Sequence, residues 1–357
     1  MSITAKEDLE RLVNEYWKER KKPDYWGVME QISDSRGYTI AYKVLVVKHK
    51  ENYDVYAAIR HGLKNGLSLG EILVEYFWFV KDSIVGINDV IHAIEAWKKF
   101  GKDIRFFAYN EEDLKNPPKE LWEVHVRLAL LSRRFKKPNE INLEGAFKLL
   151  PNLVWTNVGP FTVEDWNQKL VKGETDGIVV LAVDKFPPFF LWNPVPEGVR
   201  VANADMVRAG AHLASGTTVM HYGFVNFNAG TLGKSMVEGR ISAGTVVDEG
   251  TDMGAGGGFL GTLSGGNSIK MKAGKNCLVG AMSEVGVPLG DNCTVATGTC
   301  FAPGTPVYDL DEQCWKKAID FKDQNNLLIW RNSKNGRIEV QRKKVEVSLN
   351  EELHQND

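Results

Sequence analysis

The sequence predicts a left-handed parallel β-helix shaped as a triangular prism, preceded by an α/β region, and three observations lead to this fold class. Apolar or small residues recur at every sixth position through most of residues 199–308. This period is absent from residues 1–195, and it stops again after Tyr308. A period of six gives three short strands and three tight corners in each coil, and such coils bury a core only by stacking on one another.

Residues 1–198 are expected to form an N-terminal α/β domain. Helical spacing of apolar residues alternates there with runs of β-branched and aromatic residues. Helices are predicted over residues 6–20, 67–78, 88–100 and 121–135, and strands over residues 38–48 and 177–184. The segment 185–198 contains four prolines and is expected to be an extended connector.

Residues 199–308 are expected to form the β-helix, with three runs of inward-facing residues. These are Val201, Val207, Leu213, Val219 and Val225; Ile241, Val247, Met253 and Phe259; and Leu289, Val295, Phe301 and Val307. Residues 228–236 shift the phase of the six-residue period, and residues 261–268 form a Gly/Ser-rich excursion. Because insertions in a solenoid tend to project from one face, we expect the chemistry at these two breaks.

Residues 309–357 are expected to cap the last coil, which would otherwise present an open strand edge. The pattern predicts a helix over residues 309–323. It then predicts a hairpin built from residues 326–331 and 336–345.

Composition is that of an ordinary globular chain. The 357 residues are 43% hydrophobic and 25% charged, with a net charge of −2, which argues against nucleic-acid partners and against a polybasic membrane surface. No apolar run approaches the roughly 20 residues that span a bilayer. The charged start of the chain resembles an amphipathic helix rather than a signal peptide, so we expect a cytoplasmic protein.

The four cysteines form no CxxC pair, so we expect small, reduced residues near the coil core rather than a zinc site.

Glu238 and Arg240 are the first candidates for chemistry. They lie two positions apart, so on a strand they share a face. One interpretation is a surface ion pair; the other is a general base beside a guanidinium that binds a carboxylate. Gly261, which opens the excursion, could offer its backbone N–H to an oxyanion.

For two other candidate site residues, a structural role is the alternative to a catalytic or binding role. His221 could serve as a base or line a coil corner. Glu284 could lie in an acceptor site or be a solvated surface residue. With His212 as the only other histidine in the array, the three-histidine zinc site of a β-helix carbonic anhydrase is disfavoured.

Long segments of the sequence resemble the tetrahydrodipicolinate N-succinyltransferase family. The resemblance rests on MVEGRISAG within residues 212–266, on CLVGAMSEVGVPLGDNC at 277–293, and on the terminal NLLIWRNS and SLNEELH. It implies succinyl transfer from succinyl-CoA to the amine of L-2-amino-6-oxopimelate in lysine and diaminopimelate biosynthesis. It also implies a homotrimer with no tightly bound cofactor.

The resemblance also implies roles for individual residues. Glu238 and Gly261 match the catalytic carboxylate and the glycine that steadies the oxyanion; the carboxylate is either a base, which we favour, or a nucleophile that forms an acyl-anhydride. Arg240, Ser264 and Glu284 are expected to bind the acceptor. Residues expected to contact CoA are Gly258, Ala281, Ala296, Thr297, Gly304, Lys316, Arg331, Asn332 and Ser333.

One departure from the family concerns a structural divalent ion on the trimer axis. Asp205 matches one of its acidic ligands, but Tyr222 stands at the position of the second. Two other functions stay open from the residues alone. The chain could be a hexapeptide acyltransferase with another acyl-CoA or another amine acceptor, or its array could be only an assembly element.

Overall fold

The computed structural model describes residues 14, 18, 21–50, 57, 103–261 and 269–343. The chain divides into two compact units whose segments interleave along the sequence. Unit 1 comprises Met1–Val126, Asn142–Leu153 and Gly159–Gly177, and unit 2 comprises Arg127–Ile141, Val154–Val158 and Ile178–Asp357. Residues 127–141 and 178–198 thus belong to the same unit as the coils. The predicted domain boundaries at residues 198 and 308 stay a prediction.

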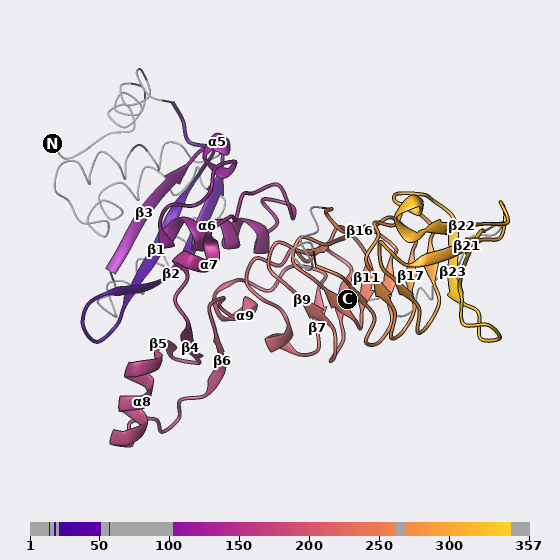
Figure 1. Ribbon diagram of the computed structural model, residues 1–357. Helices are drawn as coiled ribbons and strands as arrows, with labels where there is room; N and C mark the ends of the chain where they lie inside the picture. The colour runs from indigo at the N-terminus through magenta and orange to yellow at the C-terminus, as the bar shows by residue number, and fades with distance from the viewer. Residues whose placement is uncertain are drawn as a thin grey trace. The chain divides into compact units, whose positions relative to one another are not determined.

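Unit 1 is built on a three-stranded antiparallel sheet, shown in indigo and purple in Figure 1. Its order is β2 (Thr39–His49), β1 (Tyr25–Ser33) and β3 (Asp103–Tyr109). The strand predicted over residues 38–48 is therefore confirmed as β2. The helices predicted over residues 67–78 and 88–100 lie outside the described residues, as does 6–20 apart from two single positions.

The remaining elements of unit 1 are short. They are α5 (Glu111–Leu114), α7 (Ala146–Leu149), β5 (Gly159–Thr162) and α8 (Val163–Lys172). The Thr162 side chain caps α8 by accepting a hydrogen bond from the backbone N–H of Asp165, and Gly173 ends the helix in the left-handed conformation. The predicted helix over 121–135 is confirmed as α6 (Leu121–Ser132), which begins in unit 1 and ends in unit 2.

After the segment Arg127–Ile141, unit 2 contains most of β4 (Leu153–Thr156), then β6 (Val180–Asp184) and α9 (Phe189–Trp192), and it then winds into a parallel β-helix. The indole N–H of Trp155 on β4 donates to the carbonyl of Asp184 on β6 at 2.8 Å. The segment expected to be an extended connector thus contains a one-turn helix. Phe189 of that helix is fully buried among the coil residues, where it closes one end of the core.

Three parallel sheets form the faces of the prism (Figure 1). The first face contains β7 (Arg200–Val201), β8 (Thr217–Val219), β11 (Ser235–Val237), β14 (Asp252–Met253), β17 (Leu278–Val279) and β19 (Thr294–Val295). The second contains β9 (Phe224–Val225), β12 (Arg240–Ile241), β15 (Gly258–Phe259), β18 (Glu284–Val285) and β20 (Cys300–Phe301). The third contains β10 (Gly230–Thr231), β13 (Val246–Val247) and β16 (Lys272–Ala273). A 3-10 turn, η1 (Ala204–Met206), lies in the first coil.

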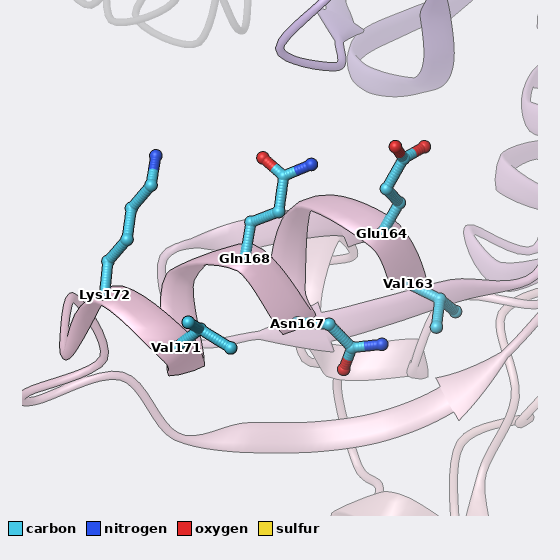
Figure 2. Close-up of a pocket in the computed structure, with 6 residues that line it drawn as sticks. All are labelled: Val163, Glu164, Asn167, Gln168, Val171 and Lys172. Atoms are coloured by element: carbon cyan, nitrogen blue, oxygen red, sulfur yellow. The ribbon is translucent and has the colours of Figure 1, made fainter.

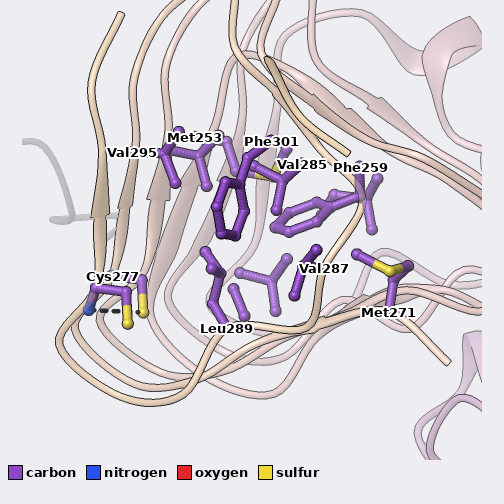
Figure 3. Close-up of a cluster of buried hydrophobic side chains, with 14 of the residues drawn as sticks. Met253, Phe259, Met271, Cys277, Val285, Val287, Leu289, Val295 and Phe301 are labelled. Atoms are coloured by element: carbon purple, nitrogen blue, oxygen red, sulfur yellow. Dashed lines mark hydrogen bonds between the residues drawn. The ribbon is translucent and has the colours of Figure 1, made fainter. Parts of the chain in front are cut away.

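The hexad residues fill the interior of the coils, as Figure 3 shows for Met253, Phe259, Val285, Val295 and Phe301. Of the predicted inward residues, all but Val201 are buried. Cys277 and Cys293 are buried free thiols, as expected, whereas Cys300 is exposed and Cys314 is half-buried.

The first break in the period lies at a different place from the one predicted. Inward positions continue without interruption through Val225, Thr231 and Val237, and the shift comes between Val237 and Ile241. Thr231 hid this continuity because it is polar. Its hydroxyl is satisfied inside the coil by the Thr217 hydroxyl at 2.6 Å and by the backbone N–H of Ala214 at 3.1 Å.

The second break is confirmed. Residues 260–271 separate β15 from β16, whereas residues 242–245 suffice to connect β12 to β13 one coil earlier. Within this excursion, residues 262–268 are outside the described part of the chain.

The C-terminal cap extends the first face with four further strands. In sheet order these are β23 (Leu327–Arg331), β24 (Ile338–Arg342), β21 (Pro306–Asp309) and β22 (Cys314–Lys317). The predicted hairpin is confirmed by the antiparallel pairing of β23 with β24. The helix predicted over residues 309–323 is wrong, because this stretch turns back as β22 and ends in the 3-10 helix η3 (Ala318–Phe321).

The segment 127–141 packs on the early coils through polar contacts. Arg134 donates to the carbonyls of Leu213 at 2.6 Å and Glu197 at 3.0 Å. The Asn139 side chain donates to the carbonyl of Gly244 at 2.9 Å, and its backbone N–H donates to the Asn228 side chain at 2.8 Å. These bonds join one loop to consecutive coils.

Replacing Asn139 is expected to destabilise unit 2. Asn139→Ala removes the bond to Gly244 and leaves alanine at a φ of +69°, so we expect a loss of about 1–3 kcal/mol. Asn139→Gly is the matched control, since it removes the same bond without the backbone strain. Chemical denaturation measures both, and an Asn139→Ala variant as stable as wild type would contradict the assigned contact.

Candidate functional site

Glu238 lies in an unusually short corner of the prism. Along the edge between the first and second faces, four residues connect the strands in the other coils: 220–223, 254–257, 280–283 and 296–299. In the Glu238 coil, only Glu238 and Gly239 connect β11 to β12. The corner is therefore recessed between its neighbours, and we call this edge of the prism the Glu238 edge.

The recess is held by tight backbone stacking. The N–H of Glu238 donates to the carbonyl of Met253 at 2.9 Å, and the N–H of Phe224 donates to that of Gly239 at 2.9 Å. A Cβ on Gly239 would lie 2.1 Å from the carbonyl oxygen of Gly257, so no larger residue fits. The half-buried Glu238 carboxylate has no hydrogen bond or ion pair with any residue that the structure describes. It is therefore available to accept a proton.

Small residues continue from Glu238 along this edge. The inward positions on the first face stack in the order Val237, Met253, Val279, Val295 and Ile329. Each is followed by one residue at the edge, and these residues are Glu238, Gly254, Gly280, Ala296 and Trp330. We call them the Glu238 row. A Cβ on Gly254 would lie 2.6 Å from the backbone nitrogen of Ala281, and a Cβ on Gly280 would lie 2.5 Å from that of Thr297. Only glycine fits at these two positions, so the middle of the row stays flat.

Several predicted CoA contacts lie on this edge. Ala296 is in the Glu238 row, and Ala281 and Thr297 are the next residues in their corners. The N–H of Gly298 donates to the carbonyl of Ala281 at 2.9 Å, which stacks these two corners directly. These three predicted contacts therefore lie along one surface strip.

Arg240 pairs with Glu284 rather than with Glu238. One guanidinium nitrogen lies 2.9 and 3.0 Å from the two carboxylate oxygens of Glu284, two strands away on the second face. Gly258 lies between them in register, and a Cβ there would be 3.1 Å from the guanidinium. Glycine at 258 thus opens the path that the arginine crosses. Both side chains are partly exposed, so the pair is worth little in stability.

Ser242 is a further member of this group that the sequence interpretation missed. Its hydroxyl donates to the carbonyl of Phe259 at 2.6 Å and accepts from Nε of Arg240 at 3.3 Å. The signal was available, because Ser242 follows Arg240 by two residues and such residues share a strand face. Together, Ser242 and Glu284 fix the direction of the guanidinium.

Gly261 lies at the opposite end of the second face from Glu238. It follows β15 at the corner toward the third face, whereas Glu238 precedes β12 at the Glu238 edge. One chain therefore does not bring the two predicted catalytic residues together. Ser264 lies outside the described residues.

The predicted contacts near the C-terminus are dispersed. Arg331, Asn332 and Ser333 lie at the turn between β23 and β24, where Asn332 donates to Glu339 at 2.9 Å. Gly304 is exposed in the turn before β21.

The ammonium of Lys316 lies between the carboxylates of Asp309 and Glu312, at 2.9 and 2.7 Å. Its charge is thus already balanced.

Asp205 and Tyr222 are exposed and lie in successive corners of the Glu238 edge. His221 precedes Tyr222 there and is exposed too. The described residues of one chain contain no group of three or more His, Cys, Asp or Glu side chains that could hold a metal ion. One carboxylate per chain with a phenol beside it is a poor donor set for a divalent ion.

A hollow elsewhere contains none of these residues. It runs along α8 and is lined by Val163, Glu164, Asn167, Gln168, Val171 and Lys172, as Figure 2 shows. All six side chains come from one helix, so the hollow is an open surface in unit 1. Within the described residues, no helix is long and apolar enough to cross a membrane.

The stacked hexapeptide coils and the recessed carboxylate define the class of protein: a hexapeptide-repeat acyltransferase with a left-handed parallel β-helix. Residues 272–300 match the hexapeptide repeat of succinyl-transferase, and residues 150–187 match the middle region of tetrahydrodipicolinate N-succinyltransferase.

Relatives identify the particular family. A 2,3,4,5-tetrahydropyridine-2,6-dicarboxylate N-succinyltransferase from Pseudomonas aeruginosa is 45% identical over 243 residues, covering 66% of this chain and 70% of the relative. The enzyme of that name from Vibrio cholerae is 45% identical over 246 residues, covering 67% and 71%. The chain belongs to this N-succinyltransferase family, and it is an enzyme.

A solved structure agrees with this assignment. A Campylobacter jejuni chain, provisionally described as a 2,3,4,5-tetrahydropyridine-2-carboxylate N-succinyltransferase, superposes with a TM-score of 0.84 at 28% identity. The match covers 95% of this chain and 98% of that one.

Asp309 gives a prediction on pH and stability. Its side chain is fully buried, which opposes ionisation, but hydrogen bonds from Arg342 and Lys316 outweigh this and lower its pKa to about 2. Because that pKa is below the ordinary 3.8, Asp309 stabilises the fold above pH 4, by up to about 2 kcal/mol, and this contribution disappears as pH falls toward 2.

We therefore expect Asp309→Asn to be less stable than wild type at pH 7, with a difference that shrinks between pH 4 and pH 2. Denaturation across this range measures it. Asp311→Asn is the control, because Asp311 is more exposed and bonds the same arginine. A difference that stays constant with pH would show that the Asp309 charge is not the cause.

Proposed function

We propose that the enzyme transfers a succinyl group from succinyl-CoA to the amine of L-2-amino-6-oxopimelate, the opened form of tetrahydrodipicolinate, in lysine and diaminopimelate biosynthesis. The observation that carries this proposal is the recessed Glu238, whose carboxylate has no partner among the described residues, at the start of a flat strip of glycine and alanine. A carboxylate in that position is suited to take a proton, and the strip is suited to an extended, narrow donor.

The chemistry follows from these groups. The acceptor amine attacks the thioester carbonyl, Glu238 takes the proton that the amine loses, and an N–C bond replaces the C–S bond. The thiolate leaves and is protonated to free CoA. The backbone N–H of Gly261 would stabilise the tetrahedral oxyanion. If Glu238 were instead the nucleophile, the same residue would carry the acyl group as an anhydride.

Arg240 is proposed to bind an acceptor carboxylate, with Ser264 and Glu284 beside it. The ordered guanidinium supports this role, since Ser242 and Glu284 fix its direction before any ligand arrives. The donor would lie along Gly258, Ala281, Ala296 and Thr297, with Gly304, Lys316, Arg331, Asn332 and Ser333 toward its nucleotide end.

We propose a homotrimer in which Glu238 of one copy and Gly261 of a neighbour complete each site. Their positions at opposite ends of one face support this, because adjoining prisms in a closed ring can bring two different edges together. We propose no tightly bound cofactor, and any divalent ion near Asp205 would be structural. The reaction would take place in the cytoplasm, where acyl-CoA donors are found.

Another acyl-CoA or another amine acceptor is the alternative. A thiol-release assay with succinyl-CoA and acetyl-CoA, using 2-aminopimelate as a stable acceptor, separates the possibilities. Faster release with succinyl-CoA and a dicarboxylate acceptor supports the proposal.

Glu238→Gln tests the role of the carboxylate. We expect at least a hundredfold loss of kcat, because proton transfer contributes about 10²–10⁴ in rate, while substrate KM changes little. Glu249→Gln, which changes an exposed glutamate in the corner between β13 and β14, is the control. Analytical ultracentrifugation should give a trimer for both variants; near-normal activity of Glu238→Gln, or an active monomer, would contradict the account.

A further inference from the structure

A row of small polar side chains runs inside the prism, at the corner where the third face turns into the first. Each member lies two residues before an inward residue of the first face, so it also points into its coil. All members are fully buried, and in coil order they are Thr217, Ser235, Thr251, Cys277 and Cys293. We call them the corner row. It begins with hydroxyls and ends with thiols in two successive coils.

The corner row has a structural task that does not require sulfur. The Thr251 hydroxyl donates to the carbonyl of Gly274 in the next coil at 2.6 Å, and it accepts from the backbone N–H of Cys277 at 2.9 Å. The Cys277 thiol repeats this arrangement with the carbonyl of Gly290 at 3.1 Å and the N–H of Cys293 at 3.3 Å. A hydroxyl is the stronger donor of the two groups. What two adjacent thiols add is the ability to bond to each other.

Strand register places the two thiols within bonding reach. Leu278 pairs with Thr294, and Cys277 and Cys293 are the residues just before them, so their Cα atoms lie one strand spacing apart, about 4.8 Å. A disulfide spans about 4.4–6.8 Å between Cα atoms. Both side chains point into the same corner, where Figure 3 shows Cys277 beside the buried cluster. Rotation of the side chains is therefore enough to bring the two sulfur atoms together.

The surroundings make the two thiols unequal. A hydrogen bond from the Cys293 thiol outweighs burial and lowers the pKa of Cys277, and the nearby positive charge of Lys343 acts in the same direction. The same hydrogen bond, together with burial, raises the pKa of Cys293. The ammonium of Lys343 is held at this position by the Thr294 hydroxyl at 3.0 Å. Cys277 is thus the better nucleophile of the pair, with Cys293 as its neighbouring thiol.

We propose that Cys277 and Cys293 form a reversible disulfide on exposure to a peroxide, which makes this end of the corner row an oxidative modification site. The proposal is independent of the proposed function, because it involves neither acyl donor nor acceptor.

The reaction has two steps. The Cys277 thiolate attacks one oxygen of hydrogen peroxide, which gives a sulfenic acid and hydroxide. The Cys293 thiol then attacks that sulfur, the S–S bond forms, and the sulfenic oxygen leaves as water with the thiol proton. The two thiols are oxidised and the peroxide is reduced. Because both sulfur atoms are buried, peroxide reaches them during local opening of the coils.

The bond would join two successive coils directly before the C-terminal cap. It closes residues 277–293 into a loop in the unfolded chain, which stabilises the fold, and it removes two weak thiol hydrogen bonds, from Cys277 to Gly290 and from Cys293 to Gln324. The covalent link outweighs the loss. We therefore expect Tm to rise by about 5 °C on oxidation and to return to its starting value with dithiothreitol.

The test uses the folded full chain with Cys300→Ser and Cys314→Ser, because these two cysteines are exposed and half-buried and would also react. The protein is treated with hydrogen peroxide, alkylated, and cleaved after glutamate without reduction. Since Glu284 lies between Cys277 and Cys293, cleavage there separates two peptides that only a disulfide holds together. We expect mass spectrometry to find the linked pair, together with the rise in Tm.

Cys277→Ser and Cys293→Ser, each in the same background, are the matched controls. Serine fits the corner row, because Ser235 already occupies an equivalent buried position. Each control should lose both the linked peptides and the rise in Tm, so any change in Tm from oxidation elsewhere is subtracted.

Three results overturn the proposal. The first is recovery of both thiols in reduced form after prolonged peroxide treatment, and the second is their recovery as sulfinic or sulfonic acids without a link. The third is a link that forms only in denaturant or between two copies, as sedimentation would show. None of these readouts needs turnover, so a protein that transfers no acyl group can still pass this test, and an active enzyme can fail it.

Discussion

Backbone hydrogen bonding between successive coils is the constraint on which the rest of this structure depends. Each short strand donates to the coil that follows, so residues at equivalent positions stack about 4.8 Å apart in straight rows. A row can carry function over a long distance because its members cannot drift out of register. The Glu238 row exists for this reason, although its residues are scattered between Glu238 and Trp330.

The same constraint makes a change in corner length a local event. Removing two residues between Val237 and Arg240 leaves the strands on both sides paired with their neighbours, so the only consequence is a recess at one edge. Glycine at 239, 254 and 280 keeps the edge flat, and glycine at 258 lets Arg240 reach Glu284. Backbone geometry thus positions the carboxylate and the guanidinium, while side-chain pairing orients the guanidinium.

Much of this could be predicted from the sequence, because a period of six is a direct consequence of coil geometry. Inward residues from Val207 to Val307 follow from it, and the terminal hairpin follows from two strand patterns on either side of a turn. The period of inward residues was interrupted too early, at Thr231, because a polar residue type does not reveal that its hydroxyl is buried and bonded to local partners. The C-terminal stretch 309–323 was misread as a helix because its strand, β22, is only four residues long and forms by antiparallel pairing with the preceding β21.

The site was predicted less completely, because its partners are distant in the sequence. Spacing suggested a Glu238–Arg240 pair, whereas Arg240 reaches a residue 44 positions away. The strand register and the ion pair with Asp309 show which side of β22 Lys316 occupies, and neither could be predicted from spacing.

The central claim is that the recess at Glu238, created by the short corner, is what makes this edge of the β-helix a catalytic site. Its most direct test is to insert two glycines between Gly239 and Arg240, which restores a four-residue corner and leaves every side chain in place. We predict an unchanged circular dichroism spectrum and sedimenting mass, together with loss of thiol release from succinyl-CoA. Near-wild-type activity in a folded insertion variant would contradict the account.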